Sequence, residues 1–505
     1  MTQTPGPDPH QKWFDREHLG QDLKGKSVKG GLRTVGAQLF SFIINIVTTI
    51  FLARLLLPED YGLVAMVTSF TGFILMFKDL GMAQAIIQMD GLNQRLVSMV
   101  FWFNFLVSIL LALIIIAMGP LLVWFYDEPL LLGITFYYSL AAIFGGLSTQ
   151  HQALLSRQMH FKELSEITIA ASFFSLMPAL WMAYAGYGYW ALVAINVLNP
   201  AIAAVLLWFR CDWRPNWTGI DWSIKDFIGF GAGVSGFNMI NYFSRNLDNI
   251  LIGRQIGSDA LGLYSKAYQL LMLPITQLRD PLNAVATPAL SSLHKQPEKY
   301  RHYYEQYLFL LAFFSMPIVA FLFVTADDII LFLLGPNWVE AAIIFQLLAI
   351  TAFIQPTAST RGMVMLSCGL STRFFFWGLW NAIFVTIAFV VGMYYGGLNG
   401  LVIGYAIVNY LILIPSLMYC FKNTPVRVAD FFKTVAAPGL ISILSAAALY
   451  QLVAIELDIH LFLQIILYAA VFGVLYLALW FPIGALRSRI LGIVDLVKSL
   501  LNKKL

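Results

Sequence analysis

Apolar runs close to the length that crosses a bilayer, about twenty residues in a helix, recur along almost the whole chain. Charged residues make up only 11% of the 505 residues, against 59% hydrophobic residues. A soluble chain carries roughly a quarter charged residues. The sequence therefore predicts an all-α polytopic membrane protein, because it supplies too little polar surface for a soluble one.

These runs divide into fourteen predicted membrane helices, the first of which begins near Thr34. That run lacks the short apolar core and small-residue cleavage site of a signal peptide, so we expect it to stay in the membrane. The predicted spans are 34–57, 61–86, 96–119, 130–153, 164–184, 188–209, 228–253, 260–290, 303–324, 328–356, 373–396, 398–421, 431–452 and 460–485.

Positive residues gather in alternate connections between these helices. They are Arg95; Arg157 and Lys162; Arg210, Arg214 and Lys225; Lys295, Lys299 and Arg301; Arg361 and Arg373; Lys422, Arg427 and Lys433; and those from Arg487 to Lys504. The intervening connections, including Asp127–Glu128 and Asp327–Asp328, hold no Lys or Arg. Because Lys and Arg collect on the cytoplasmic side of a membrane, we expect both termini to be cytoplasmic.

An internal repeat relates the two halves of the chain. The segment Leu52–Leu63 aligns without a gap on Ile252–Leu263, so that Arg54 falls on Arg254 and Gly62 on Gly262. A chance alignment of apolar helices would match Leu and Val rather than glycines and charges at turn positions. Since six helices return the chain to the side it started from, the two halves are predicted to be parallel six-helix bundles.

This repeat gives the predicted domain organisation. Helices thirteen and fourteen are then an addition to a six-plus-six core, and the connection between the halves carries Trp213, Trp217 and Trp222, which suit the headgroup level. A simple tether is the plainer interpretation of that connection. The predicted parts are a cytoplasmic N-terminal segment (1–33), an N-terminal bundle (34–209), an interfacial linker (210–227), a C-terminal bundle (228–421), helices thirteen and fourteen (422–485) and an amphipathic cytoplasmic tail (486–505).

Motifs for cofactor or metal chemistry are weak. The run Gly231–Gly236 satisfies a dinucleotide-binding pattern, but it lies inside a predicted membrane helix, where small residues that let helices approach explain it better. The glycine pairs Gly392/Gly396 and Gly400/Gly404 are each four residues apart, a spacing that also lets helices approach closely. Asp327–Asp328 fits a helix start better than a metal-binding pair of an enzyme. We expect no cofactor, no metal, no nucleic acid partner and no enzymatic activity.

Charged residues inside membrane helices are the strongest functional signal, because an ionisable group among apolar neighbours is costly unless it faces a partner or a polar cavity. Asn238, Asn241, Arg245 and Asp248 follow spacings of three, four and three, which place them on one face of the predicted seventh helix. We interpret this stripe as the lining of a water-filled passage. An internal ion pair is the alternative.

Two base–acid pairs occupy related positions in the predicted second and eighth helices. They are Lys78–Asp79 and Arg279–Asp280, both expected towards the cytoplasmic mouth. A passage-lining role and snorkelling to inner headgroups are equally supported.

Three further basic residues mark the predicted outer side. Arg54 and Arg254 end the first and seventh helices, and Lys266 enters the eighth. They could hold an anionic substrate or lipid headgroup, and closure of the Arg54/Glu59 and Arg254/Asp259 turns is an equally good explanation.

Several segments resemble the polysaccharide-transporter branch of the multidrug/oligosaccharidyl-lipid/polysaccharide exporter superfamily, the Wzx-type flippases. They are "LARLLLPEDYGLVAM" and "DLGMAQAIIQ" in the first half, "IGRQIGSDALGLYSKAYQLLMLP" and "ATPALSSL" in the second, and "LFLLGPNW" near Trp338. The resemblance covers roughly residues 30 to 485.

The resemblance implies two bundles that alternate between inward-open and outward-open states and a cavity lined by helices one, two, seven and eight. The implied substrate is an undecaprenyl-pyrophosphate-linked sugar repeat unit, flipped across a bacterial cytoplasmic membrane for exopolysaccharide, capsule or O-antigen synthesis. The expected partners are membrane lipids, a polysaccharide polymerase and export machinery. The protein is expected to be a monomer.

Two other functions remain open at the level of the sequence. A drug/cation antiporter of the same superfamily would favour acidic cavity residues, whereas the predicted stripe includes Arg245. A membrane polysaccharide polymerase is disfavoured because the predicted outer connections are all short.

Overall fold

The computed structural model describes residues 13–14, 40, 42–79, 81–89, 91–217, 242, 246–453, 455 and 459–481. Every regular element in these ranges is a helix, and they contain no β-strand. Nine of the described helices are long and apolar enough to cross a membrane. The prediction of an all-α polytopic membrane protein is confirmed. The count of fourteen stays a prediction, because parts of the first and seventh predicted spans lie outside the described ranges.

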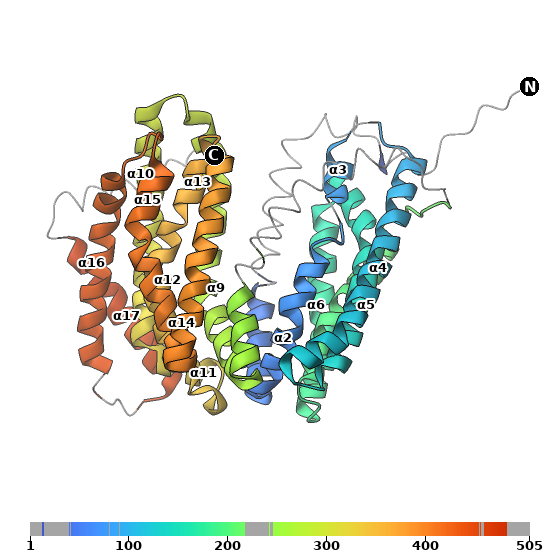
Figure 1. Ribbon diagram of the computed structural model, residues 1–505, viewed down its shortest axis with the longest axis horizontal. Helices are drawn as coiled ribbons and strands as arrows, with labels where there is room; N and C mark the ends of the chain where they lie inside the picture. Colours follow the sequence, from blue (N-terminus) through green and yellow to red (C-terminus); the bar gives the residue numbers. More distant parts are fainter. Residues whose placement is uncertain are drawn as a thin grey trace, which may run out of the picture. The chain divides into compact units, whose positions relative to one another are not determined.

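The chain divides into two compact units, Met1–Ser265 and Lys266–Leu505. The first unit ends inside the long helix α9 (Ser258–Leu293). Its other described helices are Phe42–Leu55, α2 (Pro58–Leu75), α3 (Met82–Gln88), α4 (Gln94–Tyr126), α5 (Leu131–Arg157), α6 (Phe161–Tyr184), α7 (Trp190–Arg210) and residues 246–255 (Figure 1).

The second unit holds the rest of α9 and the helices that follow it. These are α10 (Pro297–Val324), α11 (Ala326–Leu333), the 3₁₀ helix η4 (Pro336–Trp338), α12 (Ala341–Ala358), α13 (Thr360–Ser367), α14 (Ser371–Leu411), α15 (Leu413–Phe421), α16 (Val428–Val453) and α17 (Leu461–Trp480). The predicted division at a 210–227 linker stays a prediction, because that segment is described only as far as Trp217.

The predicted second helix, 61–86, is wrong as a continuous span. Helix α2 ends at Leu75, and α3 starts again after Gly81, whose φ of 75° is a left-handed conformation that favours glycine. Between them Asp79 accepts the Ala83 backbone N–H on Oδ1 at 2.9 Å. The carboxylate thus helps to start α3, which explains why the chain breaks at the polar Lys78–Asp79 pair.

The predicted tenth helix, 328–356, is also interrupted. Helix α11 carries Asp327 and Asp328 in its first turn, as expected for acidic residues at a helix start. It ends before Pro336, which opens η4, and the membrane-length helix resumes over α12 and α13. Proline lacks the N–H that a continuing helix would need, so the interruption at Pro336 follows from this one residue.

The predicted eleventh and twelfth helices meet as expected near Gly396. Although α14 is continuous by hydrogen bonding, Gly396 and Gly397 have non-helical backbone angles, so that two helices meet there. A Cβ built at Gly392 would overlap the carbonyl oxygen of Gly400, and one at Gly404 would lie 2.7 Å from that of Ala388. Close packing of small residues is therefore confirmed at Gly392, Gly400 and Gly404, whereas Gly396 has no neighbour within 4 Å.

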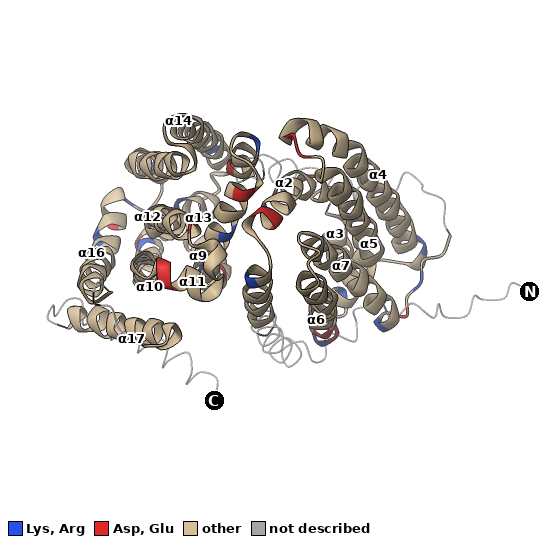
Figure 2. Ribbon diagram, turned by 90° about the horizontal axis from the view of Figure 1, so that it is seen from below, with Lys and Arg blue, Asp and Glu red and all other residues tan. Residues whose placement is uncertain are grey.

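Helices α16 and α17 belong to the core of the second unit. The side chains of Tyr476 and Trp480 are buried against Phe309 and Phe313 of α10, and the Tyr476 hydroxyl donates to the Phe313 carbonyl at 2.9 Å. Aromatic side chains bury large apolar areas, so this pair of added helices is packed tightly onto its bundle. Figure 2 shows how sparse charge is along the described helices, whose ribbons are mostly tan.

Candidate functional site

Asp248 is the described member of the predicted polar stripe. Its carboxylate accepts a hydrogen bond from the Tyr264 hydroxyl on Oδ2 at 2.7 Å and from the Asn249 backbone N–H on Oδ1 at 2.8 Å. Asn238, Asn241 and Arg245 lie outside the described residues. The stripe therefore stays a prediction, but Asp248 has a hydroxyl partner that the sequence did not suggest.

The Lys78–Asp79 pair lies in the turn between α2 and α3. Asp79 is engaged with α3 as described above. The Lys78 side chain instead extends over α5, where a Cβ built at Gly145 would lie 2.8 Å from Cδ and 2.9 Å from Nζ. Among the described residues Lys78 and Asp79 form no ion pair, so the two residues have separate roles.

The Arg279–Asp280 pair differs from its counterpart. Both residues lie within α9, and Arg279 Nη2 is 3.0 Å from Asp280 Oδ1. The aspartate is largely exposed, at 63% for the side chain, so the attraction is weakened by solvent. The two predicted base–acid pairs are therefore not equivalent in structure.

Arg254 lies against an aromatic ring. Its guanidinium carbon is 5.8 Å from the centroid of Phe125 in α4, within the range of a cation–π interaction. Its repeat partner Arg54 is exposed at the end of the Phe42–Leu55 helix. The turn after Arg54 is held by Asp60, whose Oδ2 accepts the Leu57 backbone N–H at 2.9 Å.

The starts of α2 and α9 cross at backbone distance. A Cβ built at Gly62 would overlap the carbonyl of Ser258, and a Cβ at Gly262 would overlap the carbonyl of Pro58. Both contacts join positions that the repeat makes equivalent. We refer to this contact, made by Pro58, Gly62, Ser258 and Gly262, as the glycine crossing.

Lys266 begins the second unit and is buried, with 8% of its surface exposed. Its Nζ donates to Gln269 Oε1, one turn further along α9, at 2.9 Å. The amine is thus bonded to an uncharged partner on its own helix. Asp79, Asp248, Lys266 and Arg279 are each bonded to a residue close by in the sequence.

A polar layer at one end of the first unit was missed by sequence reasoning. The buried Arg157, at the end of α5, donates to the carbonyls of Ile86, Met89 and Phe14 at 2.8, 2.7 and 3.1 Å. In the sequence Arg157 follows an apolar helix, so it was predicted only as a positive residue of a connection between helices. The signal that could have identified it is its place at the end of a helix rich in small and polar residues.

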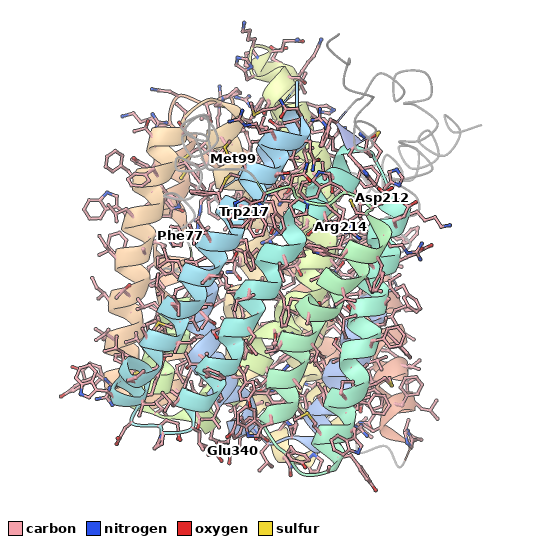
Figure 3. All side chains as sticks on the ribbon, turned by 90° about the vertical axis from the view of Figure 1, so that its right-hand side faces the viewer. Phe77, Met99, Asp212, Arg214, Trp217 and Glu340 are labelled. Atoms are coloured by element: carbon pink, nitrogen blue, oxygen red, sulfur yellow. The ribbon has the colours of Figure 1, made fainter. Side chains whose placement is uncertain are left out.

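The segment after α7 completes this layer. Trp213 is fully buried and donates from Nε1 to Gln94 Oε1 at 2.6 Å, so its side chain packs inside the protein, and its position at the headgroup level stays a prediction. Trp13 donates from Nε1 to Asp212 Oδ1 at 2.7 Å. Asp212, Arg214 and Trp217 lie at the same end of the first unit as Met99 of α4 (Figure 3). Only Trp217, 84% exposed, has the exposure expected at an interface; Trp222 lies outside the described residues.

No group of three or more His, Cys, Asp or Glu side chains that could hold a metal ion occurs among the residues the structure describes. The glycines of the 231–236 run lie outside those residues.

Residues 51–343, more than half of the chain, match the family described as "Polysaccharide biosynthesis protein". The chain belongs to this family. The matched range contains the glycine crossing, Asp248 and both base–acid pairs. The candidate site thus lies in the part of the chain that is characteristic of the polysaccharide biosynthesis protein family.

Two curated relatives are similar over most of their length. The chain is 29% identical to the teichuronic acid biosynthesis protein TuaB of Bacillus subtilis over 380 residues, which cover 74% of this chain and 77% of TuaB. It is 23% identical to the succinoglycan biosynthesis transport protein ExoT of Rhizobium meliloti over 386 residues, covering 76% and 78%. The resemblance to the polysaccharide-transporter branch is confirmed.

A solved structure of the lipid II flippase MurJ in an inward closed conformation has the same fold. The TM-score is 0.69 at 13% identity, and the match covers 88% of this chain and 97% of that one. This member of the polysaccharide biosynthesis protein family is therefore a multi-pass membrane protein with a transporter fold, not that of an enzyme.

Proposed function

We propose that this chain is a flippase that moves undecaprenyl-pyrophosphate-linked oligosaccharide repeat units from the inner to the outer leaflet of a bacterial cytoplasmic membrane, by alternating access. The observation that carries the proposal is the combination of a polysaccharide biosynthesis family with the fold of a lipid II flippase. The names of TuaB and ExoT, which refer to the biosynthesis of two polysaccharides and for ExoT to transport, agree with it.

The physical problem that such a protein solves is the passage of a charged, hydrophilic headgroup. A pyrophosphate with sugars cannot cross about 30 Å of hydrocarbon unaided. Basic side chains next to a polar path would replace part of its hydration, and Lys and Arg both bind phosphate. Lys78 and Arg254, in the first unit, are described residues of this kind, and the predicted Arg245 would add a third.

The orientation and the partners are part of the same proposal. The alternation of Lys and Arg along the chain supports cytoplasmic termini. The six-helix bundles 34–209 and 228–421 would be the two moving halves, with helices thirteen and fourteen added. The product would pass to a polysaccharide polymerase and export machinery on the outer side, and a monomer would suffice.

Deletion of the gene, followed by analysis of the lipid-linked glycans that accumulate, tests the proposal. We expect complete repeat units to accumulate on the inner face of the membrane, and expression of the unaltered chain to clear them. Accumulation of unpolymerised units already on the outer face would instead indicate a polymerase. Unchanged lipid-linked glycans with a loss of drug resistance would favour an antiporter.

A further inference from the structure

The turn between α2 and α3 separates a basic residue from its acidic neighbour. The backbone N–H of Lys78 donates to the Leu75 carbonyl at 3.1 Å, and that of Met82 donates to the Asp79 carbonyl at 2.9 Å. These bonds fix the backbone on both sides of the pair. Since the Asp79 carboxylate accepts the Ala83 N–H, it is held towards α3 and does not form an ion pair with Lys78.

The Lys78 side chain lies in a notch on α5 that exists because residue 145 has no side chain. A Cβ at Gly145 would come within 2.8 Å of Lys78 Cδ, 2.9 Å of Nζ and 3.3 Å of Cε. Distances under 3 Å between a Cβ and another heavy atom require one of them to move. Any larger residue at 145 would therefore displace the lysine stem.

Two hydroxyl groups follow Gly145 on α5, and each directs its hydrogen back to its own helix. Ser148 and Thr149 both donate to the Gly145 carbonyl, at 2.9 and 2.8 Å. Among the described residues the ammonium of Lys78 has no hydrogen-bond or ion-pair partner. A half-buried cation of this kind is stabilised by an anionic ligand. Arg279, by contrast, already has Asp280 at 3.0 Å.

We infer that Gly145 is a positioning residue, which seats the Lys78 side chain against α5 so that its ammonium can contact a phosphate group of the transported lipid. This inference rests on the proposed function. Gly145 acts by making room for the Lys78 side chain. Asp79 starts α3 and forms no ion pair with Lys78, so the ammonium can bind an anionic ligand.

The test uses the full-length purified protein in detergent and undecaprenyl pyrophosphate as the probe ligand, with affinity measured for each variant. A hydrogen bond to a charged group contributes roughly 1.5–3 kcal/mol, so Lys78→Ala should weaken binding about 10- to 100-fold. Gly145→Ala should also weaken binding. In the double variant, Gly145→Ala should change the affinity by less than about twofold relative to Lys78→Ala alone, because the lysine side chain that Gly145 positions is absent.

Gly146→Ala is the matched packing control on the same helix. A Cβ at Gly146 would lie 2.6 Å from Ser108 Cβ in α4, away from Lys78. Gly146→Ala should lower the unfolding temperature. Any change in affinity that it causes should be the same in the unaltered protein and in the Lys78→Ala variant. Lys78→Met, which keeps a flexible stem over the notch and removes the charge, should bind as weakly as Lys78→Ala.

The outcomes separate the inference from the function. If the unaltered protein does not bind the probe, the proposed function and the inference both fail. If it binds and Gly145→Ala binds equally well, or if the effects of Gly145→Ala and Lys78→Ala add, only the inference is overturned. Should Gly145→Ala alone yield no folded protein, recovery of folded protein in the double variant supports the steric coupling, and no recovery overturns it.

Discussion

Two charged residues of the first unit each lie against a residue of another helix: Asp248 accepts a hydrogen bond from Tyr264 of α9, and the Lys78 side chain lies over Gly145 of α5. The sequence identified Asp248 and Lys78 because charges within apolar helices stand out. It could not identify Tyr264 or Gly145, since a tyrosine and a glycine are ordinary in membrane helices and their roles follow from a neighbour on another turn or helix. Partner choice depends on three-dimensional packing, which periodicity along one helix does not encode.

Replacing Tyr264 with phenylalanine should destabilise the first unit by about 1–3 kcal/mol, because a hydrogen bond to a half-buried carboxylate is lost. Thermal unfolding of the purified protein measures this. Tyr394→Phe is the control. Because Tyr394 is 83% exposed, removing its hydroxyl should leave the free energy of unfolding nearly unchanged. Equal unfolding temperatures for Tyr264→Phe and the unaltered protein would show that Asp248 does not depend on Tyr264.

At the scale of helices, apolar runs located most of the membrane elements, while breaks were harder to predict. The turn after α2 and the interruption at Pro336 both fall within runs that remain apolar enough to look continuous. The junction near Gly396 was predicted by the boundary between the spans 373–396 and 398–421. A break thus follows from one or two residues, whereas a helix is supported by about twenty.

The glycine crossing should not tolerate a side chain. Gly62→Ala and Gly262→Ala should each cost about 1–3 kcal/mol, as overpacking does in a well-packed core, because the opposing atoms are backbone and cannot rotate away. Unfolding temperature and yield of folded protein are the measurements.

Gly378→Ala and Gly473→Ala are the controls for the crossing. Neither glycine has a neighbour within 4 Å of a built Cβ, and alanine is the better helix former. These variants should be neutral or slightly stabilised. If Gly62→Ala behaves as they do, the crossing is not closely packed in the protein.

Arg157 should be the most sensitive basic residue of the first unit. Arg157→Ala removes a guanidinium that bonds two carbonyls at the C-terminal end of α3 and the carbonyl of Phe14, and should cost on the order of 3 kcal/mol. Arg210→Ala, which removes an exposed ion pair with Glu166, should cost about 0–1 kcal/mol. Similar unfolding temperatures for both variants would contradict the structural role given to Arg157.

For the whole molecule, composition and the apolar runs of membrane-spanning length predicted the fold class, and the segments that resemble the polysaccharide transporters predicted the family. Parallel bundles and cytoplasmic termini rest on counting helices and stay proposals. The candidate site was predicted less well than the fold, because hydrophobic burial constrains hundreds of residues while a site depends on a few side chains. We propose that these elements together move a lipid-linked glycan between leaflets.

Translocation by the purified protein tests that claim most directly. The lipid-linked glycan that accumulates in the deletion strain is incorporated into vesicles with and without the protein, and the fraction that an added glycan-cleaving enzyme can reach is followed with time. We predict that vesicles containing the protein lose the protected inner fraction rapidly, and that protein-free vesicles retain it. Equal protection in both would contradict the account.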